Sequence, residues 1–228
     1  MLKNIRAFFD ARDVLEVDTP VLASAGNTDP YIESLQTIFR EQAYYLNTSP
    51  EFAMKRLLAV HGESIYQICK AFRDEELGPM HNPEFTMLEW YRPDFSLSEL
   101  MDEVEDLVNE VLTLGKPERL SYSDLFLRHL AIDPFAASLE SLQKLAGEKL
   151  EINLDSDNPD HWLDLLFSHC IEPNLQDPVF ITDYPASQAA LARIEENDQG
   201  RKVALRFELV ARGMELANGY HELTDAME

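Results

Sequence analysis

Two neighbouring segments of the chain carry an arginine, an aromatic residue and a carboxylate that could act together. Arg73 ends the first segment, and Phe85, Glu89 and Tyr91 belong to the second. An arginine suits phosphate because its planar guanidinium donates two parallel hydrogen bonds and keeps its charge at any relevant pH. An aromatic ring can stack on a nucleotide base, and a carboxylate beside a tyrosine hydroxyl can meet an ammonium group. These types predict a site for a nucleotide and a cationic small molecule.

Strand alternation explains how the two segments present these side chains. Residues 65–73 and 84–91 are rich in β-branched and aromatic residues, and a loop containing glycine and proline joins them, so an antiparallel pair is expected. Residues two apart share a face of a strand. One face therefore carries Gln67, Cys69, Ala71 and Arg73 on the first strand, and Phe85, Met87, Glu89 and Tyr91 on the second. The alternative is an ordinary hairpin with a few surface charges.

A second hairpin near the end of the chain carries two glutamates. The segment 206–210 alternates, Arg212 and Gly213 can turn the chain, and residues 214–219 run back. With a loop at 211–212, Glu208 would face Glu215, whereas a shift of one residue would separate them. Facing like charges cost stability unless something neutralises them, and magnesium prefers carboxylates together with nucleotide phosphates. The pair predicts a metal-nucleotide site, and the alternative is two exposed glutamates on an edge hairpin.

These segments resemble a known family. The sequence Phe72-Arg73-Asp74-Glu75 with residues 81–89 (HNPEFTMLE) is similar to motif 2 of class II aminoacyl-tRNA synthetases of the lysyl subgroup. Residues 15–20 (LEVDTP) resemble motif 1, and residues 48–57 and 215–223 resemble further lysyl-type segments. Within the subgroup, the chain is most similar to freestanding paralogues that attach (R)-β-lysine to elongation factor P. The resemblance runs from the first helix to the last residue.

The resemblance implies a role for each matching residue. ATP would be held by Arg73, which grips the α-phosphate, by Phe85, which stacks on adenine, and by Glu75, His81 and Asn82; Arg73 and Glu75 would be catalytic. Magnesium would be held by Glu208 and Glu215, which also belong to the ATP site. The amino acid would be bound by Ser49, Glu51, Glu89, Tyr91, Asn218, Tyr220 and Glu222. Several carboxylates suit a diamino acid, which has two ammonium groups.

The implied activity is ATP-dependent activation of lysine or (R)-β-lysine as an aminoacyl-adenylate, followed by transfer to a lysine side chain of elongation factor P. Two alternatives stay open: the catalytic fragment of a lysyl-tRNA synthetase, and a non-catalytic synthetase-like module that binds or regulates. The glycine-rich motif 3 is expected after the last matching segment and is absent from the chain, which favours the binding module. No strand-rich anticodon-binding barrel is present, which favours the elongation factor P paralogue.

Composition limits the class of protein and its partners. The 228 residues include 19 basic and 42 acidic ones, a net charge of −23. This charge repels a polyanion, so tRNA is an unlikely main partner, although simple solubility explains the acidic excess equally well. No apolar run approaches the roughly 20 residues of a membrane span. The cysteines, Cys69 and Cys170, have no metal-type spacing, and reduced thiols in a cytoplasmic protein are expected.

The expected architecture is an α+β class II synthetase-like catalytic domain, an antiparallel sheet flanked by helices, in a single domain over 1–228. Residues 3–12 and 50–60 predict helices, residues 31–46 predict two short strands, and residues 179–184 predict another strand. A helical insertion is expected over about 96–175, with helices over 96–112, 122–130, 139–145 and 161–170. In this family the first helix and the extended segment after it form a dimer interface, so the resemblance implies a homodimer.

Overall fold

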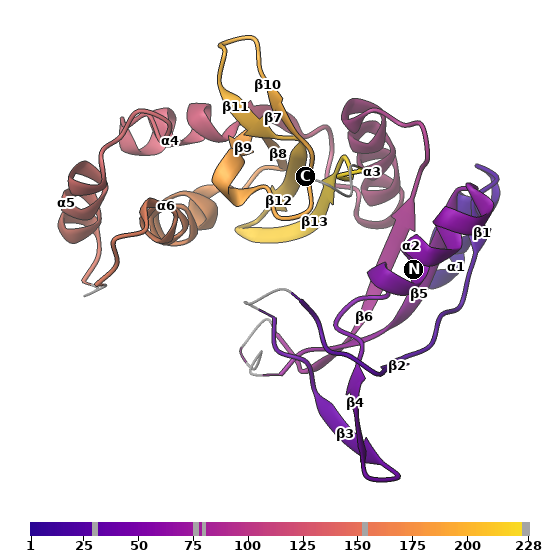
Figure 1. Ribbon diagram of the computed structural model, residues 1–228. Coiled ribbons are helices and arrows are strands. Elements are labelled where there is room, and N and C mark those ends of the chain that lie inside the picture. The colour runs from indigo at the N-terminus through magenta and orange to yellow at the C-terminus, as the bar shows by residue number, and fades with distance from the viewer. Residues whose placement is uncertain (29–31, 75–77, 79–80, 152–154, 225–228) are drawn as a thin grey trace. The chain divides into compact units, whose positions relative to one another are not determined.

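The computed structural model describes residues 1–28, 32–74, 78, 81–151 and 155–224 (Figure 1). Its internal contacts divide the chain into two compact units, Met1–Asp94 and Phe95–Glu228. Both units combine helices with sheets, which confirms the α+β expectation. The strand pairs are mainly antiparallel, but two are parallel, which the sequence did not predict.

The main sheet of the first unit contains the strand pair that the sequence predicted. Strand β5 (Ile65–Phe72) pairs antiparallel with β6 (Glu84–Tyr91) along its whole length, and β1 (Leu15–Glu16) lies parallel to β5 at the other edge. Gln67 lies directly opposite Glu89 in this register. Since opposite residues project to the same side of a sheet, the two candidate sets of side chains form one face.

Helix α1 (Leu2–Asp10) packs against aromatic residues of the other face of this sheet. Its apolar side buries Phe8 and Phe9, as the pattern of residues 3–12 predicted. The Phe9 ring stacks on Tyr66 with centroids 4.4 Å apart, and Trp90 lies opposite Tyr66 in the strand pair. The aromatic face of the sheet therefore anchors α1 by burying apolar area, and it is the opposite face that carries the polar candidates.

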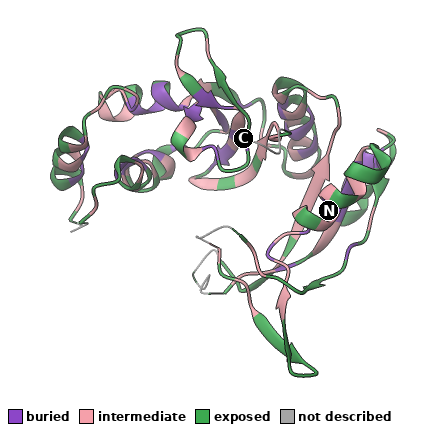
Figure 2. Cartoon of the chain, viewed as in Figure 1, coloured by how far each residue is buried: buried purple, intermediate pink, exposed green. Residues whose placement is uncertain are grey.

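The remaining elements of the first unit are a small sheet and one helix. Strand β4 (Gln42–Leu46) pairs with β2 (Leu22–Ala23) and with β3 (Gln36–Phe39), and the hairpin of β3 and β4 is largely exposed (Figure 2). Helix α2 (Glu51–His61) follows Pro50, which suits the start of a helix, and Gly62 ends it in the left-handed conformation. The predictions of two strands and a helix here are confirmed.

The second unit begins with the helices that the sequence placed in an insertion. They are α3 (Leu97–Leu112), α4 (Tyr122–Leu130), α5 (Leu139–Lys149) and α6 (Pro159–Leu166), and a π-helical turn, Phe167–Ile171, extends the last one. Capping boxes start α3 and α4, from Ser96 and Ser121. The insertion is not purely helical, because β7 (Glu118–Ser121) pairs parallel with a later strand. The sequence did not predict β7, because its four residues include only one strongly apolar side chain, Leu120.

A four-stranded sheet supports these helices. Its order is β13 (Met214–Tyr220), β12 (Arg206–Ala211), β8 (Val179–Thr182) and β7, and a smaller sheet contains β10 (Ile194–Glu196), β11 (Lys202–Ala204) and β9 (Tyr184–Pro185). The main core of this unit joins α4, α5 and α6 to β8 and β12, as the buried residues in Figure 2 show. Among the described residues, no helix is both long and apolar enough to span a membrane, and Cys69 and Cys170 are free cysteines.

Gly219 in β13 allows a close packing contact that any larger residue would disturb. A Cβ at this position would lie 2.5 Å and 2.7 Å from two ring atoms of Phe207, which is fully buried. We expect Gly219→Ala to lower the free energy of unfolding by about 1–3 kcal/mol through overpacking, measured by urea denaturation. The control is Gly147→Ala in α5, where a Cβ meets no atom within 4 Å and should stabilise the helix by up to about 1 kcal/mol. An unchanged urea midpoint for Gly219→Ala would contradict the steric argument.

Candidate active site

A buried carboxylate with two hydroxyl donors forms the centre of the site in the first unit. Ser49 donates a hydrogen bond of 2.6 Å to Oε2 of Glu89, and the Tyr91 hydroxyl donates one of 2.7 Å to Oε1. Burial raises the pKa of the Glu89 carboxyl above its usual value, against the effect of these two hydrogen bonds. Glu89 forms no ion pair with a lysine or arginine that the structure describes, although the charge of Lys55 also lowers its pKa and that of Glu51 raises it. A buried carboxylate of this kind is a receptor for a cation.

Ser49 also links this carboxylate to the start of α2. Its hydroxyl accepts a hydrogen bond of 3.0 Å from the Glu51 backbone N–H. The Glu51 carboxylate forms an ion pair of 2.5 Å with Lys55, one helical turn away. Four of the predicted amino-acid ligands, Ser49, Glu51, Glu89 and Tyr91, therefore lie in one hydrogen-bonded cluster. Sequence analysis missed Lys55, although a spacing of four residues from a glutamate on a helix is a recognised signal.

The expected phosphate ligand and the expected adenine surface are in contact. The Arg73 guanidinium lies 5.2 Å from the centroid of the Phe85 ring, a cation–π distance, and Nε lies 3.4 Å from the Thr48 carbonyl oxygen. The Arg73 backbone N–H donates to the Pro83 carbonyl, which extends the pairing beyond the strand ends. Arg73, directly after β5, and Phe85, near the start of β6, therefore lie at the same end of the strand pair.

The loop after β5 carries three further predicted nucleotide ligands. Glu75 lies outside the described residues. His81 is exposed and exchanges backbone hydrogen bonds with Gly78, and Asn82 is exposed beside it. The described part of the loop therefore leaves the side chains of His81 and Asn82 accessible to a ligand.

In the second unit, the observed register of the β12–β13 hairpin does not place Glu208 opposite Glu215. Its turn is Arg212–Gly213, both residues with positive φ, and Glu208 lies opposite Asn218 while Glu215 lies opposite Val210. The direct pairing of Glu208 with Glu215 that a loop at 211–212 would give is therefore wrong. The two glutamates still share a face, offset along the strands, because Val210 lies two residues from Glu208.

A β-bulge brings the other predicted residues of β13 to this same face. The register shifts between Leu209 and Val210, so Asn218 lies opposite Glu208 and Tyr220 lies opposite Arg206. Without the shift, Ala217 would occupy the position of Asn218, and the amide would point to the other side of the sheet. Glu222 follows β13 and forms an isolated bridge with Ala192.

Arg206 is a member of this face that sequence analysis missed. Its guanidinium donates to Oε1 of Glu208 and lies 4.4 Å from the centroid of the Tyr184 ring, and the paired side chains are only 15% and 14% exposed. The signal was present in the sequence, since residues 206 and 208 share a strand face. The arginine neutralises Glu208 and keeps its carboxylate in place.

The carboxylates of this face fit a metal ion that a nucleotide helps to bind. Among the described residues there is no cluster of three or more histidine, cysteine, aspartate or glutamate side chains that could hold a metal by itself. Magnesium commonly takes only one or two carboxylates and completes its shell with phosphates and water. Glu208 and Glu215 supply two carboxylates on one face, which fits that pattern.

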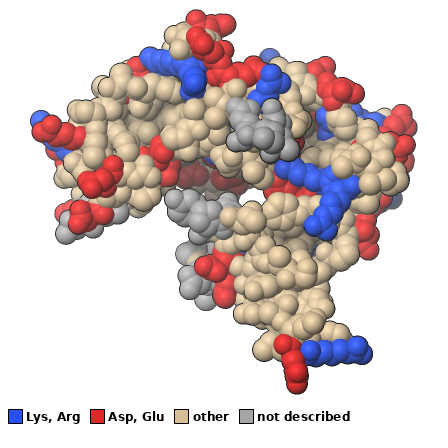
Figure 3. Space-filling view, in the orientation of Figure 1, with Lys and Arg blue, Asp and Glu red and all other residues tan. Residues whose placement is uncertain are grey.

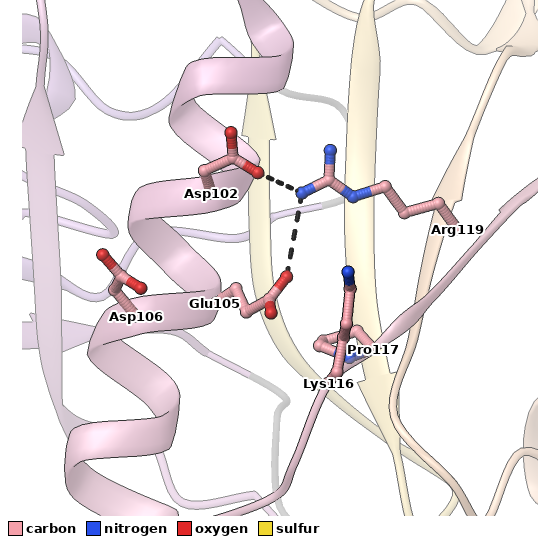
Figure 4. A pocket seen from close by; sticks show the side chains of 6 residues that line it. All are labelled: Asp102, Glu105, Asp106, Lys116, Pro117 and Arg119. Atoms are coloured by element: carbon pink, nitrogen blue, oxygen red, sulfur yellow. Dashed lines mark hydrogen bonds and ion pairs between the residues drawn. The ribbon is translucent and has the colours of Figure 1, made fainter.

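A separate groove of about 570 Å³ lies between α3 and the start of β7 in the second unit (Figure 4). Arg119 forms ion pairs across it with Asp102 at 2.5 Å and Glu105 at 3.8 Å. None of the predicted site residues lines this groove. The charge of Arg119 is therefore neutralised within the protein. Figure 3 shows acidic side chains spread over the visible face of both units.

Comparisons with known proteins identify the family of this chain. A family model described as tRNA synthetases class II (D, K and N) matches residues 1–228. The chain belongs to the class II tRNA synthetases. This confirms the family that the motifs indicated, and with it the class II character of the α+β fold.

Individual curated relatives give a more specific comparison than the family model does. The chain is 48% identical over 239 residues to an elongation factor P (R)-β-lysine ligase of Edwardsiella ictaluri, and 49% identical over 238 residues to the ligase of the same name in Pseudoalteromonas translucida. A ligase of that name from Histophilus somni is 44% identical over 236 residues. Each match covers 100% of this chain and 72–73% of the relative, so the chain spans about three quarters of their length.

Proposed function

We propose that this protein activates (R)-β-lysine, or lysine, with ATP and transfers it to a lysine side chain of elongation factor P. The observation that carries the proposal is the Glu89 carboxylate, which is largely buried, accepts two hydroxyl hydrogen bonds and forms no ion pair with a described residue. A diamino acid supplies a cation for this carboxylate. The names of the relatives support the same substrate and acceptor.

In the first step the carboxylate of the amino acid attacks the α-phosphorus of ATP, and pyrophosphate leaves. Arg73 binds the α-phosphate and stabilises the charge that develops on its oxygens. Phe85 holds the adenine, while Glu75, His81 and Asn82 complete the nucleotide site. Ser49, Glu51, Glu89 and Tyr91 fix the amino acid, so the step depends on positioning and charge neutralisation and needs no protein nucleophile.

Residues of the second unit serve the same reaction. Asn218, Tyr220 and Glu222 bind the amino acid, and Glu208 and Glu215 hold Mg²⁺, which neutralises phosphate charge when bound with the nucleotide. Arg206 keeps the Glu208 carboxylate oriented. We assign residues 1–228 to one catalytic domain on the strength of the family match over the whole chain.

In the second step an unprotonated lysine amine of the acceptor attacks the carbonyl carbon of the adenylate. An amide bond forms, the bond between that carbon and the phosphate oxygen breaks, and AMP leaves. The proton of the amine passes to solvent. We place this reaction in the cytoplasm, in agreement with the two free thiols, and we expect tRNA to play no part because of the net charge of −23.

A homodimer also belongs to this proposal, through α1 and β1. Leu2 and Leu15 are 47% and 55% exposed, and apolar side chains of this size on the expected contact segments suit an interface. Light scattering of the full-length protein tests it. A monomer at micromolar concentration would contradict it.

The decisive experiment is amino-acid-dependent ATP–pyrophosphate exchange by the full-length protein, with (R)-β-lysine, α-lysine or no amino acid. We expect exchange with (R)-β-lysine well above α-lysine, and intact-mass spectrometry of elongation factor P should show the added residue. Preference for α-lysine together with tRNA charging would indicate a synthetase instead. No exchange with any amino acid would indicate a binding module.

A further inference from the structure

Two buried side-chain carbonyl oxygens in the first unit have no hydrogen-bond partner. Gln67 is 1% exposed and lies directly opposite Glu89 in the strand pair, and its Oε1 makes no hydrogen bond. Oδ1 of Asn47, a half-buried residue that also acts on the Cys69 thiol, is likewise buried and unpartnered. Buried side-chain acceptors are normally satisfied, so two of them in one cluster require an explanation.

The thiol of Cys69 ties these two amides together. Gln67 and Asn47 both act on its pKa, which they lower, and Cys69 lies on the same sheet face as Gln67 and Glu89. Burial, and then the charge of Glu89, raise the pKa of this thiol, so it stays protonated at neutral pH. The carbonyl oxygens of both amides have no hydrogen-bond partner.

The cluster therefore contains oxygens to which no donor is directed. Glu89 provides a charged carboxylate, Gln67 and Asn47 provide neutral unpartnered oxygens, and the hydroxyls of Ser49 and Tyr91 are already directed at Glu89. A primary ammonium has three donors and no acceptor, which complements such a cluster. A carboxylate or hydroxyl of a ligand would add further acceptors and fits less well.

We propose that Gln67, assisted by Asn47, determines specificity for an amine by accepting hydrogen bonds from the ammonium that Glu89 neutralises. The inference rests on the proposed function and adds residues to its amino-acid site. A neutral amide opposite Glu89 supplies an acceptor without a second buried charge, so one ammonium satisfies the whole cluster. Gln67 thus accepts hydrogen bonds from the ammonium and orients it, while Glu89 supplies the negative counter-charge.

The test is Gln67→Met in the full-length protein, which keeps the length of the side chain and removes its carbonyl oxygen. We expect the Michaelis constant for (R)-β-lysine in the exchange reaction to rise by about 10-fold or more, with that for ATP within about twofold, because a hydrogen bond to a charged donor is lost. Removing a buried unpartnered oxygen should also raise the melting temperature. Gln67→Glu keeps an acceptor and should retain more affinity than Gln67→Met.

Lys70→Met is the matched control, on the same strand but on the other face, where Lys70 is 55% exposed and paired with Glu84. It should change neither Michaelis constant. Two monoamines, 3-aminohexanoic acid and 6-aminohexanoic acid, then locate the contact as competitive inhibitors. Gln67→Met should weaken only the one whose amine reaches Glu89.

The outcomes separate failure of the inference about Gln67 from failure of the proposed function. Equal weakening of both monoamines, or of ATP and amino acid alike, would show a merely structural role for Gln67. An unchanged Michaelis constant for (R)-β-lysine, or a Gln67→Met protein that is less stable or does not fold, would also overturn the inference. A wild-type protein without amino-acid-dependent exchange would instead overturn the proposed function, and the inference with it.

Discussion

Replacing Arg73 with alanine is expected to lower amino-acid-dependent ATP–pyrophosphate exchange by about 100- to 1,000-fold, the range for removing one donor from a developing oxyanion. The guanidinium lies beside the Phe85 ring, so the variant loses the group that we propose binds the α-phosphate beside the proposed adenine surface. Arg73→Lys keeps the charge but loses the planar fork, and should fall between wild type and Arg73→Ala. Initial exchange rates at saturating ATP and amino acid measure both.

Arg40→Ala is a matched control for this variant. Arg40 is exposed, in the turn between β3 and β4, and lies 5.2 Å from the ring centroid of Phe39, the same distance as Arg73 from Phe85. Both substitutions remove one cation–π contact, which contributes about 0.5–1 kcal/mol at an exposed site, and Arg73→Ala also removes the contact of Nε with the Thr48 carbonyl oxygen. Only Arg73→Ala should lose activity. Comparable rates for the two variants would remove Arg73 from the mechanism.

Local patterns predicted most of the fold because they report which face of an element is buried. Phe8 and Phe9 share the apolar side of α1, and strand alternation placed Glu89 and Tyr91 on one face of β6. The apolar spacing over 96–112 likewise predicted α3, whose start at Ser96 is a capping box with Glu99. In each case the information lies within a few residues of the element it describes, so a single sequence is sufficient.

Features that depend on pairing between distant segments could not be predicted in the same way. The bulge in β13 moves Asn218 to the face of Glu208, and no rule of strict alternation places residues 215, 218 and 220 on one side. The parallel pairing of β7 with β8 joins segments about 60 residues apart and leaves only a weak local pattern. The unpartnered oxygen of Gln67 is a property of the packed interior, since in the sequence a glutamine between two apolar residues indicates only a strand.

Replacing Glu89 with glutamine is expected to lower kcat/KM for the amino acid by at least about 100-fold, because the buried counter-charge of the ammonium is lost. The same substitution should raise the melting temperature at neutral pH, since it removes a largely buried charge that forms no ion pair in the free protein. Exchange kinetics and thermal unfolding of the same preparations measure the two effects. Glu84→Gln, at the exposed start of β6 and on the opposite face of the strand from Glu89, is the control and should change kcat/KM little.

The dependence on pH follows from the raised pKa of Glu89. Its usual value is 4.5, and burial makes the folded protein hold the proton more tightly than the unfolded chain does. Between 4.5 and the raised pKa, increasing pH therefore reduces the stability of the free protein. The ammonium of the substrate requires the ionised carboxylate, so kcat/KM should fall as pH decreases through the same raised pKa. Glu89→Gln should abolish both dependences, and an acid limb that persists in this variant would mean that another group controls amino-acid binding.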